Sequence, residues 1–166
     1  MKKRMLAAGM AIVLSLGLLV GCGTADTPAA TDGGAAPASG DTIKIGAALA
    51  LTGGSAEQGT RALRGVRLAV EEANAAGGIN GQMLEVVSLD DKADPKEAAN
   101  VANKLAADES VMGVIGHTNS SCTLAGAPIY EKAGLVDITT CSSSPKISDA
   151  GDYIFRVWNS DKYTAR

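Results

Sequence analysis

Short apolar segments alternate with longer helix-like segments along most of this 166-residue chain, and this alternation constrains the fold more than any other feature. Continuous apolar runs predict strands at 43–49, 83–89, 111–115, 135–138 and 153–157. Such runs are typical of a parallel sheet that is covered by helices on both faces. The sequence therefore predicts an α/β fold with a doubly wound parallel sheet. The common strand order 2-1-3-4-5 would place the topological switch point between the first and third strands.

The first predicted helix follows the turn Thr52-Gly53-Gly54-Ser55. Apolar residues recur in it at three- and four-residue spacing and are expected to form a buried stripe: Ala62, Val66, Ala69, Val70 and Ala73. The arginines of this segment, Arg61, Arg64 and Arg67, lie between these positions and predict a solvated helix face.

A second helix is predicted to begin at Asp94-Pro95, because proline is favoured at the first helical position. Glu97 is placed to reach back toward the N–H of the cap residue, as in a capping box. A third helix is predicted over 124–133, and another begins after Asn159-Ser160-Asp161.

The first residues of the chain have the pattern of an export signal. Residues 1–4 are Met-Lys-Lys-Arg, and the apolar run 5–20 is shorter than the roughly 20 residues that a membrane-spanning helix needs. Leu19-Val20-Gly21-Cys22 resembles the bacterial lipobox, in which the cysteine is acylated and becomes the new first residue. We therefore expect residues 1–21 to be a lipoprotein signal peptide, and the protein to be extracytoplasmic and lipid-anchored to the bacterial membrane through Cys22.

Residues 22–41 are expected to be the acylated cysteine and a disordered tether. Between 24 and 41 every residue is Ala, Asp, Gly, Pro, Ser or Thr, so no large apolar side chain offsets the entropy of ordering. Residues 42–166 remain, which is enough for one small domain.

Composition disfavours several classes of partner. A net charge of −3 and a scarcity of aromatic residues argue against nucleic-acid binding. The single histidine and the thiols of Cys122 and Cys141 do not make a tetrahedral metal set, so neither metal nor cofactor is expected. Whether Cys122 and Cys141 pair depends on a Cα separation that the sequence does not give.

Two hydroxyl-rich runs, 116–123 and 139–145, each follow a predicted strand. The carboxyl ends of parallel strands meet at one edge of the sheet, so hydroxyls and free N–H groups from both runs should converge on one crevice. Neutral donors of this kind suit a small anion such as a carboxylate.

Other sites fit the sequence less well. Gly53, Gly54 and Gly59 match neither the dinucleotide nor the P-loop spacing. Asp90-Asp91 at a strand end resembles a phospho-acceptor site, but such domains work in the cytoplasm. A capping or solvated role is expected for this pair instead.

A serine hydrolase would use Ser120 or Ser121 as nucleophile and His117 as base. The sequence contains no G-x-S-x-G elbow, and no carboxylate that would orient His117 is evident. His117 is therefore expected to be a polar residue at a strand end, satisfied by local backbone.

From Ile43 to about Arg156 the chain resembles the type I periplasmic binding proteins of ABC transporters, in the leucine/isoleucine/valine-binding branch. The resemblance is carried by several co-linear segments: 43–46, Thr52-Gly53 with Gly59, 74–81, Asp90-Asp91, 94–98, 101–105, Gly116-His117 with Ser120-Ser121 and Thr123, and 129–131.

This resemblance implies one lobe of a two-lobe clamp that closes on an amino acid. It implies that Ser120 donates its hydroxyl to the ligand α-carboxylate and that Ser143 contributes a hydroxyl and a backbone N–H. The Cys141 carbonyl would accept from the ammonium. Gln58 stands where some members have an aromatic residue that packs on the ligand side chain, which leaves side-chain specificity open.

The implied function is that of a substrate-binding lipoprotein of an ABC importer, with no catalytic activity. Its ligand would be leucine, isoleucine, valine or a related amino acid, and its protein partners the permease subunits. Residues 42–166 would then be the N-terminal lobe of a truncated two-lobe domain. A secreted serine hydrolase and the ligand-sensing lobe of a receptor remain alternatives at this point.

Overall fold

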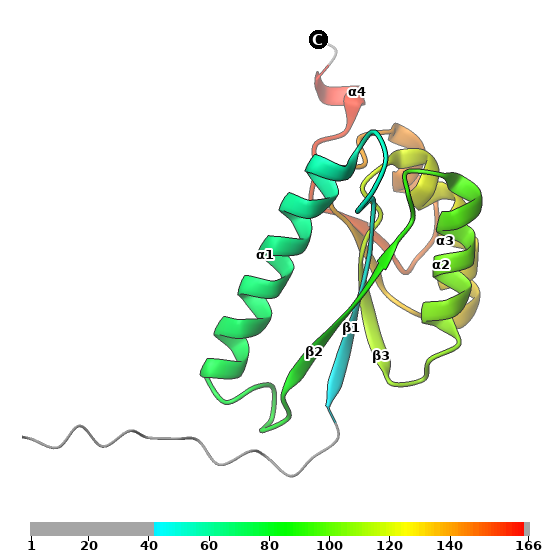
Figure 1. Cartoon of the computed structure of the whole chain (residues 1–166). Coiled ribbons are helices and arrows are strands. Elements are labelled where there is room, and N and C mark those ends of the chain that lie inside the picture. Colours follow the sequence, from blue (N-terminus) through cyan, green and yellow to red (C-terminus); the bar gives the residue numbers. More distant parts are fainter. Residues whose placement is uncertain (1–41, 165–166) are drawn as a thin grey trace, which may run out of the picture. The chain divides into compact units, whose positions relative to one another are not determined.

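The computed structural model describes residues 42–164, which form one five-stranded parallel sheet flanked by helices (Figure 1). The strand order is β2-β1-β3-β4-β5, which is the common doubly wound order considered above. The strands are β1 (Ile43–Leu49), β2 (Leu84–Asp90), β3 (Val111–Gly116), β4 (Asp137–Thr139) and β5 (Ile154–Arg156). The doubly wound α/β fold is therefore confirmed.

The helices lie on both faces of the sheet. Figure 1 shows α1 (Ala56–Ala75) on one face, and α2 (Pro95–Ala106) and α3 (Ser120–Ala133) on the other. A 3₁₀ turn, η1 (Pro145–Asp149), precedes β5, and a short α4 (Asp161–Thr164) lies beyond the carboxyl ends of the strands. Such a three-layer arrangement buries both faces of the central strands.

The larger hydrophobic core lies between the sheet and the α2–α3 pair. Its buried members come from both helices, from the sheet and from η1: Ala48, Val101, Ala102, Leu105, Val111, Val114, Ala127, Tyr130, Ile147 and Ile154. A smaller cluster under α1 contains Ala47, Leu49 and Leu63. The α2–α3 face therefore carries most of the apolar burial that stabilises the described residues.

The stripe predicted for α1 is only partly buried. Four of the five predicted residues are half-buried, and the fifth, Ala69, is exposed. The large apolar side chain that α1 buries is that of Leu63, which the prediction did not include. An apolar groove of about 380 Å³ runs beside the helix and is lined by Ile45, Gly65, Val66, Ala69, Val70, Leu84 and Ile115. The prediction of a fully buried stripe was wrong because α1 contacts β1 and β2 without covering the sheet beyond them.

The start of α2 is capped as predicted, but only by one of the two expected contacts. The Asp94 side chain accepts hydrogen bonds from the N–H groups of Lys96 and Glu97, at 2.8 and 3.0 Å. The Asp94 N–H itself donates to the carbonyl of Asp91, at 2.9 Å. Glu97 therefore does not close a capping box, because a backbone carbonyl already accepts that proton.

Helix α3 begins at Ser120, four residues before the predicted start at 124. Serine and threonine at 120–123 were interpreted as a loop, but they form the first turn, where hydroxyl residues are tolerated because the backbone N–H groups lack partners within the helix. Ser120 and Ser121 are thereby placed at a helix N-terminus. Strands β4 and β5 also shift by up to two residues from the predicted limits.

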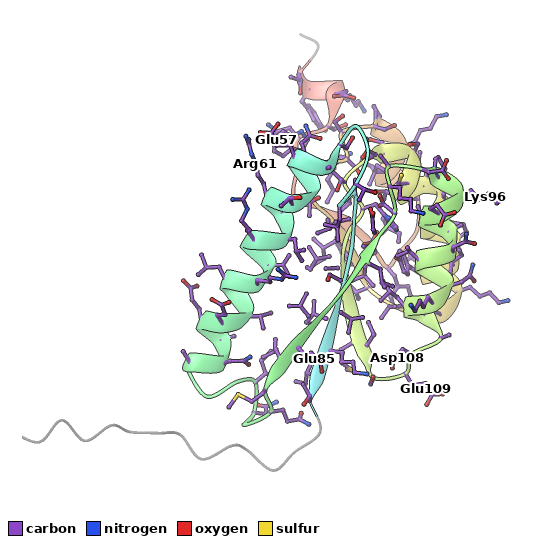
Figure 2. The ribbon with its side chains drawn as sticks, in the orientation of Figure 1. Glu57, Arg61, Glu85, Lys96, Asp108 and Glu109 are labelled. Atoms are coloured by element: carbon purple, nitrogen blue, oxygen red, sulfur yellow. The ribbon has the colours of Figure 1, made fainter. Side chains whose placement is uncertain are left out.

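The charged side chains labelled in Figure 2 lie on the outside of the molecule. Glu57 and Arg61 form an ion pair on α1, while Glu85, Asp108 and Glu109 lie near the amino ends of the strands. Arg61, Arg64 and Arg67 are all exposed, as predicted. Among residues 42–164, no helix is both long and apolar enough to cross a bilayer. The predicted signal peptide, Cys22 and tether lie outside the described residues.

Asp137 places a carboxyl group without hydrogen-bond partners inside this core. It is fully buried in β4 and lies in register between Val114 of β3 and Ile154 of β5. Neither carboxylate oxygen has a hydrogen-bond partner. Burial raises the pKa of Asp137 well above its ordinary value, because the charged form is poorly solvated there.

We predict that Asp137→Val stabilises the protein by about 1–3 kcal/mol at pH 8, because it removes a buried polar group without partners. The raised pKa of Asp137 also determines the direction in which stability changes with pH. Wild-type stability should fall as the pH rises above about 3.9, the pKa of an unfolded aspartate, and should keep falling until the folded-state pKa is passed.

Urea unfolding followed by circular dichroism at pH 5 and pH 8 measures this effect. The advantage of Asp137→Val over wild type should be larger at pH 8. Asp149→Asn, at an exposed position, serves as the control and should leave the pH dependence unchanged. An advantage that shrinks as the pH rises would contradict the assignment.

Candidate ligand-binding site

The carboxyl ends of β1 and β3 hold two segments face to face. The Asn119 side-chain N–H donates to the Ser55 hydroxyl at 3.1 Å, and the Ala50 N–H donates to the Thr118 hydroxyl at 3.3 Å. Gly59 lets α1 approach this end closely, because a Cβ there would collide with the carbonyl of Ala50. The turn before α1 and the 116–123 run thus meet across the switch point between β1 and β3.

Asp90 organises the turn that follows β1. Its carboxylate accepts from the N–H groups of Leu51 and Thr52, from the Thr52 hydroxyl at 2.6 Å, and from the Lys92 N–H. Burial alone would raise the pKa of Asp90, but the Thr52 hydroxyl and the three backbone N–H groups together hold it below its ordinary value. Asp90 therefore has the capping role that was predicted for it.

Ser120 brings the two hydroxyl-rich runs together. Its Oγ accepts a hydrogen bond from the Ser144 N–H at 3.2 Å. A serine hydroxyl has two acceptor lone pairs and one proton, so this contact leaves the Ser120 proton available for an anion. Ser120 is also the first residue of the 14-residue helix α3, whose N-terminus favours negative charge.

The other predicted ligand residues, Ser143, Cys141 and Gln58, differ in burial and in hydrogen bonding. Ser143 lies in the 139–145 run, and its hydroxyl donates to Asp161 Oδ2 at 3.0 Å. The Asp161 N–H returns a bond to the Ser143 carbonyl at 2.9 Å. Cys141 is half-buried just after β4, and Gln58 is exposed on the first turn of α1. Ser143 must therefore be released by Asp161 before its hydroxyl can donate to a ligand.

A buried hydroxyl cluster is formed by Thr123 of α3 and by two residues of the 139–145 run, Thr139 and Ser142. Ser142 Oγ lies 2.7 Å from both threonine hydroxyls, and the two threonine hydroxyls are 3.1 Å apart. Thr139 and Ser142 also donate to the carbonyl of His117, at 2.8 and 3.4 Å. The cluster joins α3, β4 and the 139–145 run in the interior.

The surroundings of His117 differ from the prediction. Its ring is fully buried, with Nδ1 2.6 Å from Asp91 Oδ2 and Nε2 3.2 Å from the Tyr130 hydroxyl. A carboxylate therefore does orient His117, and side chains rather than local backbone satisfy its ring. Asp91 is buried, not solvated. This arrangement does not support a hydrolase, because Nε2 faces a core tyrosine instead of Ser120 or Ser121.

Both cysteines of the described segment are free thiols. Cys122 is buried and Cys141 half-buried. Burial, followed by the negative charge of Asp91, raises the pKa of the Cys122 thiol to about 11. Within residues 42–164 no three His, Cys, Asp or Glu side chains are grouped so that they could hold a metal ion.

Comparison with known families agrees with this arrangement. A sequence profile described as "Periplasmic binding protein" matches residues 42–165, which is most of the chain. The chain belongs to the periplasmic binding protein family. Since this is a family of binding proteins, the expectation that the chain is not an enzyme is confirmed.

Relatives of known name lie in the branch that the sequence indicated. The chain is 44% identical over 118 residues to a Pseudomonas aeruginosa protein named as a leucine-, isoleucine-, valine-, threonine- and alanine-binding protein. The matched region covers 70% of this chain and 31% of that relative. The chain thus spans about a third of the length of the curated relatives that it matches.

Solved structures of this family share the fold. The branched-chain amino acid transporter substrate-binding protein LivJ from Streptococcus pneumoniae, in complex with isoleucine, superimposes with a TM-score of 0.70 at 37% identity, covering 73% of this chain and 35% of that one. A Rhodopseudomonas palustris solute-binding protein in complex with 3,4-dihydroxy benzoic acid superimposes with a TM-score of 0.66 at 25% sequence identity. The match covers 72% of this chain and 32% of that one.

The sequence did not reveal several polar residues at this end of the sheet. Asp91 and Tyr130 contact His117 from 26 and 13 residues away, and Asp161 reaches Ser143 from 18 residues away. No pattern in the sequence linked Asp91 or Tyr130 to His117, or Asp161 to Ser143. The available signal was Asp91 itself, an acidic residue directly after an apolar strand whose end meets the end of the His117 strand.

Proposed function

We propose that this chain is a lobe of an extracytoplasmic substrate-binding protein of an ABC importer, and that it holds the α-carboxylate of leucine, isoleucine, valine or a related amino acid. The observation that carries the proposal is the placement of Ser120. Its hydroxyl accepts from the Ser144 N–H and keeps a free proton, and Ser120 is the first residue of α3, directly after the carboxyl end of β3.

The chemistry of the crevice favours a carboxylate over a bulkier or cationic group. Hydrogen bonds from neutral donors to an ionised acceptor are short and strong, and they need no buried countercharge. Relatives with bound ligands support this choice, because isoleucine and 3,4-dihydroxy benzoic acid share only the carboxylate group. We infer that this lobe recognises the carboxylate, while Gln58 faces the variable part of the ligand.

The remainder of the site is proposed to come from a second lobe. The relatives are about three times as long as the region matched, and in a clamp of this kind the ligand is enclosed when two lobes close by a hinge motion. The Cys141 carbonyl would accept from the ligand ammonium. ABC transporter permease subunits are the proposed protein partners.

The protein is further proposed to be anchored in the bacterial membrane through acylated Cys22. The support is the sequence Leu19-Val20-Gly21-Cys22, with a basic leader and an apolar run before it and a polar segment after it. Several acyl chains hold a protein on a bilayer far more firmly than one.

The binding proposal predicts that Ser120→Ala weakens leucine affinity roughly ten- to a hundred-fold. The lost hydrogen bond to a charged group is worth about 1.5–3 kcal/mol. Isothermal titration calorimetry on the protein including its second lobe measures the change. Ser143→Ala should have an effect of similar size.

Ser121→Ala is the matched control, since Ser121 is the neighbouring exposed residue in the same helical turn and has no assigned ligand contact. It should change affinity less than about two-fold. Equal losses at Ser120 and Ser121 would place the ligand elsewhere and overturn the assignment of Ser120.

The anchoring proposal predicts that the mature protein starts at Cys22 and carries a thioether-linked lipid. Intact-mass analysis of protein extracted from membranes should give the acylated mass, and Cys22→Ser should leave an uncleaved or soluble form. A mature N-terminus elsewhere, or an unmodified Cys22, would refute the lipoprotein assignment without touching the binding proposal.

A further inference from the structure

Three buried side chains from three different elements form one continuous polar chain. Asp91 follows β2, His117 follows β3, and Tyr130 lies in α3. The Asp91–His117 contact is 2.6 Å and the His117–Tyr130 contact is 3.2 Å, and all three side chains are fully buried. Burying so many polar atoms is unfavourable unless each finds a partner, so the chain specifies how these elements meet.

The contacts fix the protons in this chain. Asp91 Oδ1 accepts from the Ala93 N–H at 2.9 Å, and Oδ2 faces His117 Nδ1. A carboxylate can only accept, so Nδ1 carries a proton, and in the neutral imidazole Nε2 then accepts from the Tyr130 O–H. Burial, with the charges of Asp137 and Asp91, raises the pKa of Tyr130, which keeps this hydroxyl protonated.

The residues packed around the His117 ring leave little room for another ring orientation. A Cβ added at Gly126 would lie 2.8 Å from His117 Nε2, so α3 approaches the imidazole closely at this point. The tyrosine and histidine ring centroids are 5.9 Å apart. Packing and hydrogen bonding therefore hold His117 in one position.

The backbone of His117 connects this chain to the proposed ligand site. Its carbonyl accepts from Thr139 and from Ser142, two members of the hydroxyl cluster. Ser142 stands between Cys141 and Ser143, the residues to which ligand contacts are assigned. A shift of His117 would thus reach these residues through one hydrogen bond and one peptide unit.

We propose that His117, held by Asp91 and Tyr130, is a positioning residue for the 139–145 run and thereby sets ligand affinity without touching the ligand. The inference rests on the proposed function for its effect on affinity. Its effect on the run itself is independent of any ligand.

The first measurement is the tautomer of His117, read from two-bond ¹H–¹⁵N correlations of labelled protein. The signal is assigned by its loss in His117→Gln. Wild type should show the Nδ1–H tautomer. In Asp91→Asn the side-chain amide donates toward Nδ1, because its oxygen continues to accept from Ala93, so the ring should convert to the Nε2–H tautomer.

The second measurement is amide hydrogen exchange at 141–144 together with leucine affinity by calorimetry. Asp91→Asn and Tyr130→Phe should speed exchange at 141–144 by roughly ten-fold or more and weaken leucine binding by about three- to thirty-fold. Leu63→Ala is the control for general destabilisation, because Leu63 packs with Ala47 and Leu49 in the separate cluster under α1. Leu63→Ala should not speed exchange at 141–144 more than elsewhere in the protein, and it should leave leucine affinity unchanged.

An Nε2–H tautomer in wild type would overturn the proton assignment, and equal exchange at 141–144 in the control and the two variants would overturn the positioning role. The outcomes separate this inference from the proposed function. If wild type does not bind leucine while the tautomer and exchange changes occur, the positioning role stands and the proposed ligand fails. If leucine binds wild type and all variants alike, the positioning role fails and the proposed function stands.

Discussion

The pairing of β1 with strands on both of its sides holds this lobe together. All seven residues of β1 pair with β2, and five of them pair with β3. The chain leaves β1 toward one face of the sheet through α1 and leaves β3 toward the other face through α3 (Figure 1). In open α/β sheets, ligands bind outside the carboxyl ends of the strands, at the point where the chain departs to opposite faces, and here that point lies between β1 and β3.

Buried polar groups are distributed unevenly around that crevice. Most of those at the carboxyl ends are paired: Asp91 with His117, His117 with Tyr130, and the hydroxyl cluster with the His117 carbonyl. The Asn119 amide oxygen and the Thr140 hydroxyl are the unpaired atoms there. Asp137, by contrast, is buried in β4 with neither oxygen paired. Paired groups specify a unique arrangement, whereas an unpaired one only lowers stability.

Much of the fold follows from patterns within single segments. Apolar runs predicted the strands and Asp94-Pro95 predicted the start of α2, because these depend on local spacing and cap chemistry. Ser120 was proposed as a ligand residue because of the family resemblance, and the hydroxyl-rich run that contains it follows a strand. The start of α3 was missed because serine and threonine suit both a loop and a first helical turn.

Other features depend on contacts between distant segments, which no local pattern encodes. The partial burial of the α1 stripe reflects how far that helix extends over the sheet. The partners of His117 and the contact between Ser143 and Asp161 arise only when strand ends meet. Such contacts define the polar interior of the site, and they were visible only in three dimensions.

The central claim is that the crevice at the carboxyl ends of β1, β3 and β4 recognises a carboxylate. Comparing leucine with leucinamide by calorimetry, on the protein including its second lobe, tests this most directly, because the amide keeps the side chain and the ammonium but loses the charged acceptor. The account predicts roughly ten- to a hundred-fold tighter binding of leucine, since hydrogen bonds to a charged group contribute about 1.5–3 kcal/mol each. Equal affinity for the two compounds would contradict it.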